Sequence, residues 1–150
     1  MKTCKLLREQ VAAATGSKKA ELVLKNAQIV NVFTQSVETG DIAIEGGYIV
    51  GIGNYEGITE KDLGGAYVCP GFLDGHIHIE SSMTSPGEFE RAVVPHGTTA
   101  VITDPHEIAN VAGTAGIRFM MQSAQKLDLD VYFMLPSCVP ATDLDESGAE

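Results

Sequence analysis

The segment Pro70-Gly71-Phe72-Leu73-Asp74-Gly75-His76-Ile77-His78-Ile79-Glu80 decides how the rest of the chain is interpreted. It is an apolar, glycine-punctuated run that carries histidines at two alternate positions. Side chains two residues apart lie on the same face of a β-strand. We therefore expect His76 and His78 to direct their imidazoles toward one point, as two ligands of a divalent metal ion do. The alternative is a pair of hydrogen-bonded structural histidines, and the alternation at a strand end favours the metal site.

After residue 67 the chain alternates between apolar strands and helices. The expected strands cover residues 71–77, 98–103 and 131–135, and the expected helices cover residues 85–94 and 113–127. Continuous apolar strands separated by helices are typical of a parallel sheet that is covered on both faces. The strand starts lie about 30 residues apart, which is the length of one βα unit of a barrel or of a doubly wound sheet. Because an eight-stranded barrel needs about 250 residues, we expect this chain to be the front part of a longer protein.

The first part of the chain has a different pattern. We expect a short helix over residues 5–14, which Gly16 ends. Two strand pairs should follow, one turning around Asn26 and one around Gly46-Gly47, because two glycines between apolar runs are a hairpin signal. The domains we expect are a β-rich, sandwich-like unit at residues 1–68 and an incomplete α/β unit at residues 69–150.

Composition and charge exclude several classes of protein. Twenty acidic and ten basic residues give a formal net charge of -10, which argues against a nucleic-acid partner. No stretch approaches the roughly 20 apolar residues of a membrane span, so we expect no membrane partner. The three cysteines contain no Cys-x-x-Cys pair, and no signal peptide precedes them. We therefore expect a cytoplasmic protein.

Polar side chains follow each of the expected strands. His76, His78 and Glu80 follow the first strand, and Asp104, His106 and Glu107 follow the second. Ser137 and Cys138 follow the third. Ligands of parallel α/β folds bind at the carboxyl ends of the strands, so these clusters are expected to converge on one site.

Three of these polar residues have alternative roles. Asp104 and His106 are candidates for substrate contacts or for an additional metal ion, although Asp104 also suits a turn cap and His106 a loop. Glu80 is either a further metal or substrate residue or only the partner of a nearby cation. The sequence alone does not choose between these roles.

Several blocks of the chain together resemble a known family. The run from Pro70 to His78 resembles the first barrel strand of the amidohydrolase superfamily, and residues 20–53 resemble its small β domain. More narrowly, Asp104-Pro105-His106-Glu107-Ile108-Ala109-Asn110 and three other blocks resemble the adenine deaminases of bacteria and archaea. The other blocks are His76–Met83, His96–Thr99 and Leu135–Ala141.

This resemblance implies a fold, a reaction and a cofactor. The fold is the beginning of a TIM-like (β/α)8 metal-dependent hydrolase barrel. The reaction is the hydrolysis of adenine to hypoxanthine and ammonia, at a binuclear centre of manganese or iron, with zinc also compatible with imidazole ligands. His76 and His78 would bind one of these metals. The remaining ligands and the catalytic acid and base would follow Glu150, so the isolated 150 residues are expected to be inactive. We further expect the intact enzyme to be a homo-oligomer.

Two other functions stay open. The first is a different amidohydrolase that acts on a cyclic amide or amidine, as dihydroorotase does. The second is a non-catalytic barrel homologue that serves as a binding scaffold, although such a protein has no need of the paired histidines.

Overall fold

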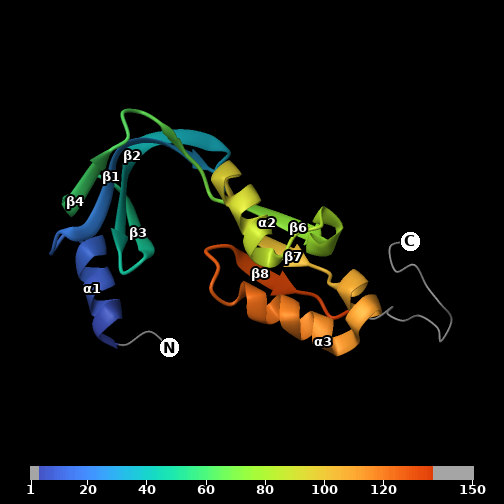
Figure 1. Cartoon of the computed structure of the whole chain (residues 1–150). Coiled ribbons are helices and arrows are strands. Elements are labelled where there is room, and N and C mark those ends of the chain that lie inside the picture. Colours follow the sequence, from blue (N-terminus) through green and yellow to red (C-terminus); the bar gives the residue numbers. More distant parts are fainter. Residues whose placement is uncertain (1–3, 137–150) are drawn as a thin grey trace. The chain divides into compact units, whose positions relative to one another are not determined.

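The structure is a computed structural model and describes residues 4–136. It divides into two compact units, one that ends at Pro70 and one that begins at Gly71 (Figure 1). None of the helices within residues 4–136 is long and apolar enough to span a membrane. The two units are described separately below.

The first unit is a mixed sheet with one helix. Its elements are helix α1 (Cys4–Ala14) and strands β1 (Ala20–Asn31), β2 (Ser36–Glu45), β3 (Tyr48–Gly53), β4 (Gly57–Asp62) and β5 (Tyr67–Val68). The strand order is β3-β2-β1-β4, and β5 also pairs with β1. β2 is antiparallel to both of its neighbours, whereas β4 and β5 run parallel to β1. The expected helix is confirmed; the second layer of a sandwich stays a prediction, since the described strands of this unit form one sheet.

One expected turn of this unit is wrong. β1 runs straight through Asn26, where we expected two strands joined by a turn. Asn26 has a positive φ of 58°, and the register against β2 shifts between Leu24 and Ala27. Asparagine tolerates this left-handed conformation, so it supplies a bulge in one long strand as readily as a turn between two. The hairpin at Gly46-Gly47 is confirmed, with positive φ at both glycines.

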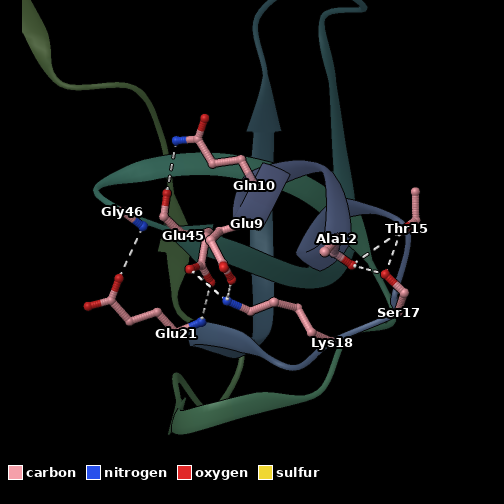
Figure 2. Close-up of polar contacts among 9 residues, drawn as sticks. All are labelled: Glu9, Gln10, Ala12, Thr15, Ser17, Lys18, Glu21, Glu45 and Gly46. Carbon is pink, nitrogen blue, oxygen red and sulfur yellow. Dashed lines mark hydrogen bonds and ion pairs between the residues drawn. The ribbon is translucent and has the colours of Figure 1, made fainter. Parts of the chain in front are cut away.

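A lysine fastens helix α1 to the sheet. Lys18 Nζ lies 2.7 Å from Glu9 Oε2 and 2.9 Å from Glu45 Oε1 (Figure 2). Glu45 also accepts a hydrogen bond from the backbone N–H of Glu21, and its backbone carbonyl accepts one from Gln10 Nε2. The middle of helix α1, the start of β1 and the end of β2 are therefore held together by Lys18, Glu45 and their partners.

The second unit is a three-stranded parallel sheet with helices. Its elements are β6 (Phe72–Ile77), the 3-10 turn η1 (Ile79–Ser82), α2 (Pro86–Val93), the 3-10 turn η2 (Val94–His96), β7 (Thr98–Thr103), α3 (His106–Ala124) and β8 (Asp130–Phe133). The strands are hydrogen-bonded in chain order, β6-β7-β8, and all are parallel. The three predicted strands and their direction are thus confirmed, and the chain has an α/β second unit.

The two α-helices of this unit share one core. Phe89 of α2, Val101 of β7 and Met120 of α3 belong to a single buried cluster, together with Ile79 and Leu129. α2 and α3 also contact each other. Both described helices therefore lie on the same face of the sheet. The expectation of helices on both faces is not met within residues 71–136.

Helix α3 begins seven residues earlier than the sequence pattern predicts. It starts at His106, and a kink at Gly113 divides it. Gly113 has φ 55° and ψ -146°, a conformation that is strained for any residue with a Cβ. We expected Gly113 to begin the helix, because the polar residues before it resemble a loop. They instead form a first helical segment that carries His106 and Glu107 directly at the end of β7.

The start of helix α2 also differs in detail. Ser85 is its N-cap residue and Pro86 its first residue, and the Ser85 side chain makes no capping hydrogen bond among the described residues. Glu88, in the first turn of the helix, has its Oε1 3.6 Å from Arg91 Nη1. The proline and the apolar face of the helix are sufficient to begin it here.

Candidate metal centre

The candidate site begins at the carboxyl end of β6. His76 is the second-last residue of this strand, and His78 directly follows the strand in extended backbone with φ -111° and ψ 99°. Two extended residues bring alternate side chains to one face, and the Nε2 atoms of the two imidazoles lie 3.1 Å apart. The structure thus brings the two histidines together, as the spacing predicts.

The end of β7 adds two further side chains. Asp104 donates its backbone N–H to Ile77 O at 2.9 Å, which aligns the ends of the two strands. Its side chain lies beside the histidine pair: ligand atoms of His76, His78 and Asp104 all lie within 4.8 Å of one another. His106, the first residue of α3, has Nδ1 3.2 Å from Asp104 Oδ2. Its ring lies edge-on to that of His78, with 4.6 Å between the ring centroids.

Glu107 completes a second group with His78 and His106. His78 Nδ1 lies 3.0 Å from Glu107 Oε2, and Ser81 Oγ donates to Oε1 at 2.8 Å. Burial would raise the pKa of the Glu107 carboxyl, but hydrogen bonds from Ser81, from its own backbone N–H and from His78 lower that pKa overall. Glu107 is therefore a carboxylate at neutral pH. The sequence places it in the cluster after β7, but only the first turn of α3 shows that it reaches His78.

Glu80 is the expected site residue that the structure keeps apart. Its Oε1 accepts a hydrogen bond of 3.4 Å from the backbone N–H of Ile108, in the first segment of α3. It belongs to neither of the two groups of converging ligand atoms found within residues 4–136. Through this hydrogen bond Glu80 joins η1 to the first segment of α3.

The residues of the first group fit a divalent cation. Two imidazole nitrogens and a carboxylate oxygen form a donor set that manganese, iron and zinc all accept. Among the described residues, Asp104 Oδ1 is buried without a hydrogen-bond partner. A buried acceptor without a partner is costly, and a cation beside it removes that cost.

Some expected site residues lie beyond this description. Ser137 and Cys138, which follow β8, fall outside the described residues. The acid and base carboxylates expected after Glu150 also lie outside it. The described site is therefore the part that β6, β7 and α3 contribute.

The chain is similar to known proteins. Residues 67–150 match the amidohydrolase family. The chain is 59% identical over 145 residues to adenine deaminase 2 of Carboxydothermus hydrogenoformans, a match that covers 97% of this chain and 25% of that protein. It is also 59% identical to the adenine deaminase of Geobacillus kaustophilus, over 143 residues, covering 95% of this chain and 25% of the relative. The chain spans about a quarter of the length of the curated relatives that it matches.

A solved structure also has a similar fold. N-acyl-D-glutamate deacylase from Bordetella bronchiseptica, crystallised with zinc and a phosphonate inhibitor, matches with a TM-score of 0.59. The match covers 79% of this chain and 30% of the deacylase at 18% sequence identity. This similarity concerns the fold alone.

Proposed function

The chain belongs to the amidohydrolase family, and from this premise we propose that it is the N-terminal part of an adenine deaminase. Such an enzyme hydrolyses adenine to hypoxanthine and ammonia. The observation that carries the proposal is the convergence of His76, His78 and Asp104 at the ends of β6 and β7, in a chain 59% identical to an adenine deaminase over 145 residues.

The proposed fold of the intact enzyme is a TIM-like (β/α)8 barrel. The strand order β6-β7-β8 of the second unit supports this proposal, because each strand is added on the same side of the one before it. α2 and α3 share one core on one face of the sheet, as the outer helices of a barrel do. A doubly wound sheet instead requires helices on both faces. The proposed site lies at the carboxyl ends of the strands, where barrel enzymes bind their substrates.

The proposed cofactor is a binuclear divalent centre, with manganese or iron as the metal. His76 and His78 would hold one ion, with Asp104 next to them. When bound, such an ion supplies the Lewis acidity that activates water at neutral pH. Imidazole and carboxylate ligands do not distinguish manganese and iron from zinc, so the choice of metal rests on the family.

Asp104 and His106 have a second proposed task. Adenine is flat and neutral, so its binding pocket needs hydrogen-bonding groups that match the ring nitrogens. The Asp104 carboxylate lies 3.2 Å from His106 Nδ1 and fixes a proton on that nitrogen when the imidazole is neutral. The Asp104–His106 pair can thereby supply hydrogen-bonding groups for the ring nitrogens of adenine.

The test is ammonia release from adenine by the intact, metal-replete enzyme. We expect turnover of adenine and no ring opening of cyclic amides such as dihydroorotate. His76→Ala and His78→Ala should each lower the bound metal and abolish most of the turnover. His96→Ala is the matched control, because this exposed histidine of η2 lies in neither converging group.

Two results would contradict the proposal. Ring opening without ammonia release would instead support a dihydroorotase-like hydrolase. Full metal occupancy in both histidine variants, with no turnover of either substrate by the unmodified enzyme, would support a scaffold protein.

A further inference from the structure

We propose that Glu107 is a positioning residue that fixes the tautomer of His78 and so keeps His78 Nε2 available to a metal ion. The inference rests on the proposed metal-dependent function, because it assigns a role to a residue beside that site. Glu107 would set the position of the proton on the His78 imidazole without binding the metal itself.

The two ring nitrogens of His78 face different partners. Nδ1 lies 3.0 Å from Glu107 Oε2, and Nε2 lies 3.1 Å from His76 Nε2. A carboxylate only accepts hydrogen bonds, and a neutral imidazole carries one proton. The proton must therefore reside on Nδ1 for that contact to form. Nε2 is left with its lone pair, on the side of the ring where His76 and Asp104 converge.

Glu107 is itself held in place by other groups. Its second oxygen, Oε1, accepts the Ser81 hydroxyl at 2.8 Å, so the two carboxylate oxygens have separate donors. The residue occupies the first turn of α3, where the helix dipole favours a negative charge. Its side chain is only 20% exposed.

The competing role is direct metal binding. Glu107, His78 and His106 also form a converging group. However, Glu107 Oε2 lies 3.0 Å from His78 Nδ1 and 3.9 Å from His106 Nε2, so its closer contact is a hydrogen bond to a ring already directed at the first group. Carboxylates that hydrogen-bond to a ligating histidine typically contribute about 10- to 100-fold in metal affinity.

The experiment measures manganese binding by the intact enzyme, without adenine. Free Mn²⁺ is followed by electron paramagnetic resonance during titration of the metal-free protein. We expect Glu107→Gln to weaken binding by about 10- to 100-fold, because the amide can donate as well as accept and no longer fixes the proton on Nδ1. The number of Mn²⁺ equivalents bound at saturation should not change. Glu107→Asp retains an ionised acceptor and should recover part of the affinity.

Two further variants keep the inference falsifiable. Ser81→Ala frees one oxygen of Glu107 and should weaken binding by a smaller factor. Glu88→Gln removes an exposed carboxylate of α2 that pairs only with Arg91 among its described contacts, and it should bind Mn²⁺ as the unmodified enzyme does.

Three results would overturn the inference. Unchanged affinity in Glu107→Gln would show that the contact has no effect on His78. Loss of a whole equivalent of Mn²⁺ at saturation would make Glu107 a ligand. A lowered melting temperature of metal-free Glu107→Gln, with full Mn²⁺ affinity at temperatures where the variant is folded, would make the role of Glu107 structural. Because adenine is absent, the outcome does not depend on whether adenine is the substrate.

Discussion

Asp41 of β2 stabilises the irregular point of the first sheet. Its carboxylate accepts hydrogen bonds from Lys25 Nζ and from the backbone N–H of Asn26, at 3.1 Å for the latter. Asn26 is the bulge residue with positive φ, so its N–H has lost its regular ladder position. The hydrogen bond from Lys25 lowers the pKa of Asp41 more than burial raises it.

Asp41→Asn should therefore destabilise the protein in a pH-dependent way. Because the pKa of Asp41 is lowered in the folded state, its ionised form contributes stability fully above the ordinary value near 3.8. That contribution is lost as the pH falls from 3.8 through the lower folded pKa. We expect the variant to be clearly less stable at pH 7, with the difference shrinking below pH 3.8, as measured by urea unfolding across this range.

A surface ion pair supplies the comparison for this experiment. Glu56 lies 3.1 Å from Lys19, and both side chains are largely exposed. Pairs of this kind contribute little, so Glu56→Gln should unfold almost as the unmodified protein does at both pH values. An equal loss in both variants would show that Asp41 acts only through surface charge.

The sequence reveals site residues when their chemistry and their spacing act together. His76 and His78 are identified because alternation along a strand has only one geometric meaning. The contact between Glu107 and His78 is not predicted from the sequence, because the two residues are 29 positions apart. The contact depends on where α3 begins, which no local pattern gives. The role of Glu80 stays a prediction. Its Oε1 accepts a hydrogen bond from the backbone N–H of Ile108, and among the described residues its Oε2 is buried without a hydrogen-bond partner.

The kinked helix α3 is the element that places the site. A Cβ on Gly116 would lie 2.7 Å from the backbone carbonyl oxygen of Ile108. The second segment of the helix therefore packs against the first with no room for a side chain at this position. The first segment carries His106 and Glu107, so its packing against Gly116 helps to set their positions.

Gly116→Ala should accordingly affect both stability and metal binding. Overpacking of this kind costs about 1–3 kcal/mol, and the displaced segment should also weaken Mn²⁺ binding. Gly87→Ala in α2 is the matched control, because the atom nearest to the new Cβ, Leu127 Cδ2, would lie 3.9 Å from it. Urea unfolding and Mn²⁺ titration of both variants provide the check. Equal behaviour of the two alanine variants would mean that α3 absorbs the new methyl group without moving.

Helices and strands are predictable here where their pattern is periodic and unbroken. β7 contains the apolar run Ala100-Val101-Ile102 and β8 the run Val131-Tyr132-Phe133, and the Gly46-Gly47 turn is a strong local signal. The bulge at Asn26 and the start of α3 are not predictable in this way. Asn26 and Gly113 both adopt a positive φ, which can either end a strand or helix or only bend it. Tertiary packing decides which of the two occurs.

At the scale of the molecule, three parallel strands do not define a closed barrel. Their order and the common face of α2 and α3 are consistent with one, and the sequence resemblance supplies the rest of the expectation. In the site, the described residues bring two imidazoles and the Asp104 carboxylate together at the ends of β6 and β7. The chain spans about a quarter of the length of its curated relatives, so these strands and side chains are the first part of the proposed barrel and site.

Metal binding should connect this site to the stability of the whole protein. A ligand that binds only the folded state stabilises it by about 2.7 kcal/mol at 100 times its dissociation constant. We therefore expect Mn²⁺ to raise the melting temperature of the intact enzyme, as followed by differential scanning calorimetry. The double variant His76→Ala/His78→Ala should lose this response, because it lacks both imidazoles of the converging group, whereas His96→Ala should retain it. A full Mn²⁺ response in the double variant would place the metal elsewhere and remove the basis for assigning the ends of β6 and β7 as the metal centre.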